Sequence, residues 1–180
     1  MQKIENASFR AEIDEHGAQL THLINKKAGF DYIWNGSEWG KHAPVLFPAI
    51  GRSNDDKYVL DGKTYEMPQH GFVSDQDFTV SYHAENVLVL ELTANDETKK
   101  MYPFDFKLTI TFTLLSTGLS LSFAVENNSD KAMPYSLGSH PAFNVPINGI
   151  AKFENYRVEF TGLEDPLKVY EIVKTPHPYR

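Results

Sequence analysis

Alternating apolar and polar residues dominate the chain, and this period of two is typical of half-buried β-strands. The longest run covers residues 104–115, where every second residue from Phe104 to Leu114 is apolar. After a turn at Thr117-Gly118, residues 119–125 alternate in the same way. The two runs predict a pair of long antiparallel strands.

Shorter runs of the same kind predict the remaining elements. The clearest hairpin covers residues 58–65, because Asp61-Gly62 suits a type I′ turn with positive φ at both central residues. Residues 95–102 are polar and predict one short helix that ends before Pro103. Val45 to Ile50 is apolar but contains Pro48, which predicts a kinked edge strand or an approach to a site. Further strands are predicted at residues 9–13, 20–24, 30–34, 78–82, 87–93 and 153–160.

The count of short strands sets the expected fold class. About ten strands with almost no helix predict an all-β chain, built as a large antiparallel β-sandwich. The chain has 180 residues, of which 41% are hydrophobic, so a sizeable core is expected. No repeat, linker or low-complexity tract divides it, and we therefore predict a single domain over residues 1–180.

Charge and composition exclude several classes of function. The formal net charge is −7 and the basic residues are scattered, which argues against nucleic-acid or anionic-membrane partners. No apolar run is long enough to predict a membrane span. The chain has no cysteine, and its first residues lack the apolar segment of a signal peptide, so we expect a cytoplasmic protein.

His140 is the first candidate for chemistry. It follows Gly138-Ser139 and precedes Pro141, and proline drives the residue before it into extended backbone. The sequence thus predicts an imidazole held at a strand end between small residues, with Phe143 as an apolar wall. A buried structural histidine in a turn fits the same residues, and spacing alone leaves both readings open.

Arg52 and His70 are the other two candidates. Each stands beside a glycine, Gly51 or Gly71, which predicts backbone that approaches another group closely. One guanidinium and two imidazoles would suit a neutral polyhydroxyl ligand, because they combine fixed donors with groups that donate or accept. A surface charge at Arg52 and a plain turn residue at His70 remain open alternatives. Aromatic faces that would cover a sugar ring are Trp34, Phe72 and Phe143.

The other polar residues give weaker indications. The remaining histidines lack the two-histidine spacing of a metal site, and no His-x-His, Gly-x-Ser-x-Gly or P-loop motif is present. We expect no metal site. The carboxylates indicate strand or turn surface and no glycosidase pair. These two sets are His16, His22, His42, His83 and His177, and Glu91, Glu97, Glu126, Glu154 and Asp165.

Three segments in a fixed order carry a family resemblance: residues 47–52, residues 69–72, and residues 127–130 with 136–143. The chain resembles the aldose 1-epimerase (galactose mutarotase-like) family, in particular its bacterial branch linked to lactose use. The resemblance implies a galactose mutarotase-like supersandwich and a hexose, such as galactose, as the small-molecule partner. It implies an isomerase that interconverts α and β anomers without a cofactor, by removing the O1 proton and protonating the ring oxygen O5.

The resemblance also implies roles for individual residues. His140 would donate a proton to O5, and His70 and Arg52 would bind sugar hydroxyls, with Phe143 as a further contact. A protonated imidazole near its ordinary pKa of about 6.5 suits the role of acid near neutral pH.

Two departures from the family pattern stand out. Val73-Ser74 follows His-Gly-Phe where relatives commonly have Ala-Arg, so a cation is missing at that point. The catalytic glutamate and a substrate-binding aspartate of the family lie beyond the matched motifs, and Glu171 matches neither.

The second departure leaves three explanations: a fragment, a truncated protein that self-associates through an open sandwich face, or a degenerate sugar-binding remnant. Of these we expect a truncated protein. Besides an isomerase, the sequence allows a non-catalytic carbohydrate-binding β-sandwich or a structural β-sandwich.

Overall fold

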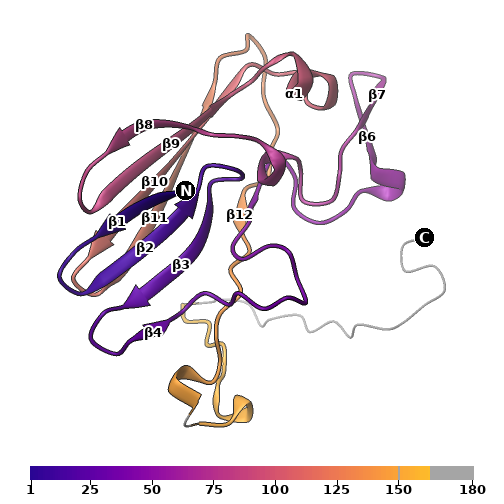
Figure 1. Ribbon diagram of the computed structural model, residues 1–180. Coiled ribbons are helices and arrows are strands. Elements are labelled where there is room, and N and C mark those ends of the chain that lie inside the picture. Colours follow the sequence, from indigo (N-terminus) through magenta and orange to yellow (C-terminus); the bar gives the residue numbers. More distant parts are fainter. Residues whose placement is uncertain (150, 163–180) are drawn as a thin grey trace. The chain divides into compact units, whose positions relative to one another are not determined.

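The computed structural model describes residues 1–149 and 151–162, and the chain divides into two compact units, Met1–Asn144 and Val145–Arg180. In the first unit, two four-stranded antiparallel sheets enclose one hydrophobic core (Figure 1). The predicted all-β antiparallel class is confirmed. The first sheet contains β1 (Gln2–Glu5), β2 (Phe9–Asp14), β3 (Gln19–Asn25) and β4 (Phe30–Asp31), and the second contains β8 (Thr79–His83), β9 (Val87–Thr93), β10 (Phe106–Leu115) and β11 (Gly118–Asn127).

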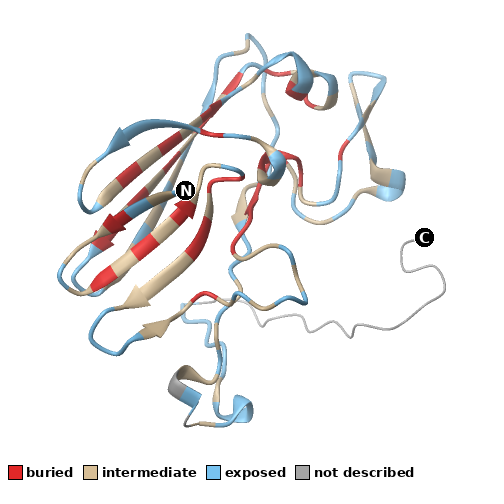
Figure 2. Ribbon diagram, in the orientation of Figure 1, coloured by how far each residue is buried: buried red, intermediate tan, exposed pale blue. Residues whose placement is uncertain are grey.

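Strands β10 and β11 form the long antiparallel pair that the sequence predicts, in register from Phe106 opposite Asn127 to Leu115 opposite Gly118. Every second side chain of β10 is buried, and this stripe is the centre of the core (Figure 2). The matching apolar side chains of β11 are only half-buried. The buried residues of β10 are Phe106, Leu108, Ile110, Phe112 and Leu114, and the half-buried residues of β11 are Leu119, Leu121, Phe123 and Val125.

The smaller elements also follow their local chemistry. In the hairpin of β6 (Lys57–Leu60) and β7 (Lys63–Glu66), Asp61 and Gly62 have φ values of 51° and 78°, as a type I′ turn requires. Helix α1 (Asp96–Met101) begins after Asn95, whose side chain accepts hydrogen bonds from the backbone N–H groups of Glu97 and Thr98. Both predictions are confirmed.

Two predicted strands differ from the structure. Strand β4 ends at Asp31, because the Asp31 carboxylate accepts N–H groups of both Leu23 and Ile33 and turns the chain out of the ladder. The strand predicted at residues 153–160 is wrong: a single 3₁₀ turn, Phe153–Asn155, is present instead. The apolar alternation there meets no partner strand within the described residues, and Val158 is 80% exposed.

Two short strands connect the sheets to the candidate residues. Strand β5 (Val45–Leu46) pairs with β12 (Gly138–Ser139), so segments more than ninety positions apart in the sequence lie side by side. The described helices include none long and apolar enough to cross a bilayer. Strand β1 was not predicted, because only Ile4 of its four residues is buried and no alternation is visible.

Candidate functional site

Backbone pairing holds His140 at a strand end, as predicted. Ser139 lies opposite Val45 in the β5–β12 ladder, and the His140 N–H donates to the Pro44 carbonyl at 3.0 Å. Its imidazole is exposed rather than buried, so the structural-histidine reading of the sequence does not hold. The extended backbone before Pro141 therefore presents the ring at the surface of the unit.

The backbone N–H and C=O groups of Gly51 both bind His70. Its N–H donates to the Gly51 carbonyl at 2.8 Å, and the Gly51 N–H donates back to His70 Nδ1 at 3.0 Å. A backbone N–H can only donate, so Nδ1 is the accepting nitrogen and the ring proton of neutral His70 lies on Nε2. The donor nitrogen of the ring therefore points away from Gly51.

The turn at His70 requires a glycine at position 71. Its φ is 78°, and a Cβ atom at this position would lie 2.0 Å from the Phe47 carbonyl oxygen. Phe47 itself is fully buried. The close approach predicted at this glycine is thus an approach to the core backbone, and it seats the His70 turn on the hydrophobic core.

The two histidines share one cavity of about 410 Å³, here called the histidine cavity. The ring centroids of His70 and His140 lie 6.0 Å apart, and the Trp39 ring lies 5.2 Å from that of His140. Two imidazoles from separate segments and one indole face thus surround a space of small-molecule size. Its lining residues are Trp39, Lys41, Pro44, Leu46, Gln69, His70, Ser74, Asp75 and His140.

A charge pair forms another part of the wall. Lys41 Nζ lies 2.7 Å from Asp75 Oδ1 and donates to the Ser74 carbonyl at 3.1 Å. The hydrogen bond from Lys41 lowers the pKa of the Asp75 carboxyl below its ordinary value of 3.8. Sequence reasoning missed this pair and Trp39, because a lysine or tryptophan in a loop carries no spacing that separates it from ordinary surface.

The other two predicted site residues do not line this cavity. Arg52 pairs with Asp56, Nε to Oδ1 at 2.8 Å, although it directly follows the Gly51 that holds His70. Phe143 is 59% exposed and borders a separate apolar cavity of about 170 Å³ with Leu119 and Leu121. The structure therefore brings His70 and His140 together, while the roles predicted for Arg52 and Phe143 remain predictions.

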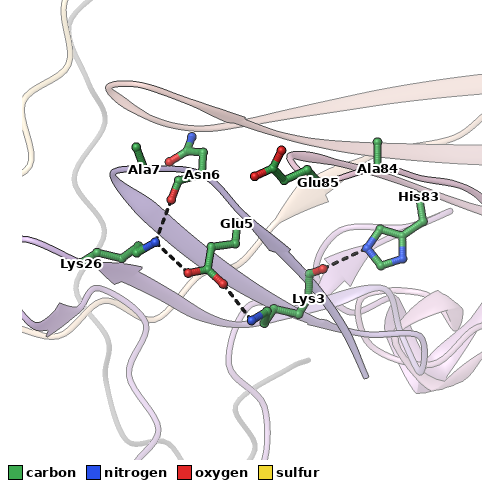
Figure 3. Close-up of a pocket in the computed structure, with 8 residues that line it drawn as sticks. All are labelled: Lys3, Glu5, Asn6, Ala7, Lys26, His83, Ala84 and Glu85. Atoms are coloured by element: carbon green, nitrogen blue, oxygen red, sulfur yellow. Dashed lines mark hydrogen bonds and ion pairs between the residues drawn. The ribbon is translucent and has the colours of Figure 1, made fainter.

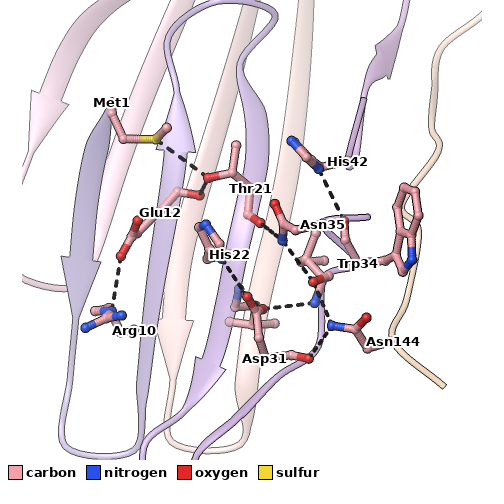
Figure 4. A network of polar contacts seen from close by, with 12 residues as sticks. Met1, Arg10, Glu12, Thr21, His22, Asp31, Trp34, Asn35, His42 and Asn144 are labelled. Carbon is pink, nitrogen blue, oxygen red and sulfur yellow. Dashed lines mark hydrogen bonds and ion pairs between the residues drawn. The ribbon is translucent and has the colours of Figure 1, made fainter. Parts of the chain in front are cut away.

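The other two predicted aromatic residues, Phe72 and Trp34, do not line the histidine cavity. Phe72 is 2% exposed and belongs to the core, so it offers no face to a ligand. The Trp34 carbonyl lies 3.2 Å from His42 Nδ1 within a polar network near β3 (Figure 4). The same network contains His22, whose Nδ1 lies 2.5 Å from Asp31 Oδ2. His42 thus binds the backbone that follows β4, and His22 binds the carboxylate at the end of β4.

A larger surface concavity, about 770 Å³, lies elsewhere in the first unit (Figure 3). Its centre is Glu5, which pairs with Lys26 at 2.7 Å and Lys3 at 2.8 Å. These hydrogen bonds, from Lys26 first and then Lys3, lower the pKa of Glu5 to about 2. His83 Nε2 lies 2.9 Å from the Lys3 carbonyl oxygen. Lys3, Glu5 and Lys26 of this concavity pair with one another, and none of the predicted site residues lies there.

Comparison with known proteins decides the family. The model of the aldose 1-epimerase family matches residues 1–177. The chain belongs to the aldose 1-epimerase family. The match includes the segments at residues 47–52, 69–72, 127–130 and 136–143, and the recognition made from the sequence is confirmed.

Curated relatives within the aldose 1-epimerase family include two LacX proteins of Lactococcus lactis subsp. lactis. The plasmid and chromosomal forms are each 32% identical to this chain, over 172 and 170 residues. Each alignment covers 90% of this chain and 56% of the relative. The chain thus spans about half the length of the curated relatives it matches.

Solved structures of the family agree with the fold. A galactose mutarotase-like protein from Lactobacillus casei ATCC 334 is 47% identical, with a TM-score of 0.79 over 81% of this chain and 50% of that chain. A galactose mutarotase related enzyme from Lactobacillus acidophilus is 37% identical, with a TM-score of 0.81 over 84% and 51%. The galactose mutarotase-like fold predicted from the sequence is thereby confirmed over the matched part.

Proposed function

We propose that this chain binds a hexose in the histidine cavity and that its protein interconverts the α and β anomers by general acid–base ring opening. One observation carries the proposal: in a member of the aldose 1-epimerase family, His70 and His140 meet across one small cavity with ring centroids 6.0 Å apart. Ring opening needs a proton delivered to O5 and a proton removed from O1, which positioned side chains supply without a cofactor.

Each residue of the cavity has a proposed role. The exposed ring of His140 donates the proton to O5, and His70 donates from Nε2 to a sugar hydroxyl, since its Nδ1 is occupied by Gly51. The face of Trp39 covers the C–H surface of the sugar ring beside His140. Arg52 remains a proposed hydroxyl ligand, because Asp56 accepts from Nε and leaves the terminal nitrogens to bind others.

A second candidate is a carbohydrate-binding β-sandwich without turnover. Asp75 is the carboxylate that lines the cavity within the described residues, and its pairing with Lys41 lowers its pKa and makes it a weak base. An acid without a matching base loses about 10²–10⁴-fold of rate. This observation favours binding over catalysis for the chain by itself.

Exchange of the α and β anomers of D-galactose and D-glucose, followed by NMR, tests the proposal. An exchange rate above that of buffer alone in the wild type, lost in His140→Ala, would support turnover by this chain. Lys100→Met is the matched control, because Lys100 lies on helix α1 and pairs with Glu97, outside the cavity. It should exchange the anomers as fast as the wild type.

Saturation-transfer NMR with the same hexoses separates the two candidates. Binding with no exchange above buffer supports the carbohydrate-binding module and contradicts turnover by this chain. Absence of both binding and exchange at tens of millimolar sugar contradicts the sugar site altogether. Binding that His140→Ala and His70→Ala leave unchanged places the sugar outside the histidine cavity.

A further inference from the structure

The Lys41–Asp75 pair joins two loops on the wall of the histidine cavity. Lys41 lies in the loop before β5, and Asp75 ends the 3₁₀ turn Val73–Asp75. Their contact of 2.7 Å, with the further bond from Lys41 to the Ser74 carbonyl, fixes an ammonium beside a carboxylate. Both residues line the cavity together with His70 and His140.

Each partner keeps hydrogen-bonding capacity for a ligand. An ammonium has three N–H donors, and the bonds to Asp75 and Ser74 use two of them. The described residues provide no partner for the third donor. The carboxylate of Asp75 accepts from Lys41 and, at 3.3 Å, from the Ser74 hydroxyl, which leaves further lone pairs. The side chains are 32% and 64% exposed, so a ligand in the cavity reaches both.

We propose that Lys41 and Asp75 determine substrate specificity in the histidine cavity, by binding adjacent hydroxyl groups of a neutral hexose and disfavouring sugars that carry a phosphate. The inference rests on the proposed sugar site. The ammonium donates to one hydroxyl oxygen and the carboxylate accepts from its neighbour, which is the complement of a vicinal diol. A paired ammonium and carboxylate carry no net charge, so they match an uncharged ligand.

The charge of the pair, of His70 and of the whole chain supports the same preference. Asp75 is ionised at neutral pH, since Lys41 holds its pKa below the ordinary range, and it neutralises the ammonium that would otherwise attract a phosphate. His70 accepts from Gly51 at Nδ1 and contributes a neutral ring. The chain as a whole has a formal charge of −7, which repels a phosphate.

Two variants test the inference by sugar binding, measured as NMR titrations with D-galactose and D-galactose 6-phosphate. Lys41→Met should weaken galactose binding by about tenfold, the loss expected for one hydrogen bond from a charged donor. Asp75→Asn removes the neutralising charge from Lys41. It should shift the affinity ratio toward the phosphate by about fivefold, the effect of one unit charge at about 4 Å in water.

Matched controls isolate the cavity from long-range charge. Asp77→Asn removes the same charge two positions along the chain, where Asp77 contacts His16 and does not line the cavity. It should leave the affinity ratio within twofold of the wild type. Lys41→Arg keeps the cation and should keep galactose binding, which separates lost charge from lost folding. Thermal unfolding of every variant completes the comparison.

The outcomes separate this inference from the proposed function. A wild type that binds neither sugar contradicts the sugar site itself. A wild type that binds galactose, with folded Lys41→Met and Asp75→Asn variants of unchanged affinity and unchanged ratio, overturns the specificity role and leaves the sugar site standing. A wild type that prefers the phosphate over galactose overturns it as well.

Discussion

His70 shows most clearly how single residues build the site. One residue, Gly51, fixes both its backbone and its ring through its own N–H and C=O groups. Because the N–H of Gly51 points at Nδ1, the donor nitrogen of the neutral ring is Nε2, which lies 3.3 Å from the side-chain amide of Gln69. A histidine in a mobile turn would have to select its tautomer when the ligand arrives.

The tautomer of His70 is a direct prediction. In the wild type near neutral pH, we expect the neutral ring to carry its proton on Nε2. Long-range ¹H–¹⁵N correlation spectra of the imidazole would check this. A ring protonated on Nδ1 would be incompatible with the hydrogen bond from Gly51.

Asp75 offers a second test at this scale. Lys41 lowers its pKa, so the variant Lys41→Met should raise that pKa toward the ordinary value of 3.8. A carboxyl whose pKa is lowered by folding stabilises the protein above the ordinary pKa, and this contribution disappears as the pH falls through the lowered value. A carboxyl NMR titration of both proteins measures the shift. Equal titration midpoints would show that the pair does not persist in solution.

Gly71 should be intolerant of any side chain. Gly71→Ala meets the Phe47 carbonyl at 2.0 Å and also strains a φ of 78°. We expect it to lower the free energy of unfolding by about 2–5 kcal/mol. Gly62→Ala has the same φ of 78° but open space around the new Cβ, so only about 1–2 kcal/mol is expected. Urea unfolding measures both, and equal losses would contradict the close approach.

The sequence predicted the residues of the site unevenly. His70 and His140 stand in motifs with fixed neighbours, Gly71 and Pro141, whose backbone constraints are readable without a structure. Ser74 stands where relatives of the resembled family commonly have an arginine, so a cation is missing there. The structure places the ammonium of Lys41 against the Ser74 carbonyl. A contact between loops 33 positions apart carries no periodic pattern, so no sequence rule finds it.

At the scale of elements, apolar alternation predicts strands well when a partner strand lies next to them. Strands β9 to β11 alternate over seven to ten residues and pair with sequence neighbours, which makes their register almost local. Residues 153–160 alternate too, yet form a 3₁₀ turn and unpaired backbone in the structure. The period of two shows which residues share a face of a strand. It does not show whether a second strand lies beside them to pair with.

Strand β10 should contribute most to stability among the strands, because its inward side chains are buried. Ile110→Ala removes a fully buried side chain and should cost about 2–5 kcal/mol of unfolding free energy. Thr111→Ala, on the opposite face of the same strand, should cost less than about 1 kcal/mol. Urea unfolding of the two variants tests which face of β10 points into the core. Similar losses of unfolding free energy would contradict the assignment of Ile110 to the inward face.

At the scale of the whole molecule, the edge of the second sheet is covered less well than its centre. The inward residues of β10 are buried, whereas those of β11 are half-buried and continue to the apolar cavity beside Leu119 and Leu121. Within the described residues, β11 pairs with β10 alone, so its other edge presents unpaired backbone groups. Self-association through this open face, expected from the sequence, remains a prediction.

Sedimentation velocity over a range of concentrations tests the prediction of self-association. We expect the mean sedimentation coefficient to rise with concentration, because unpaired strand edges and apolar side chains favour association. Leu121→Lys places a charge on the open face and should reduce the rise, whereas the surface variant Lys100→Met should not. A wild type that stays monomeric throughout would show that this face needs no second copy.

The close packing of the His70 turn against the backbone of Phe47 has a consequence for ligand recognition. Gly71 lies against the backbone of a residue that is completely enclosed by the core, so the turn cannot shift without disturbing the sandwich. The imidazole is consequently preorganised, and a small molecule that binds it bears no entropic penalty for ordering that loop. Affinity at this position is built into the folding of the domain itself.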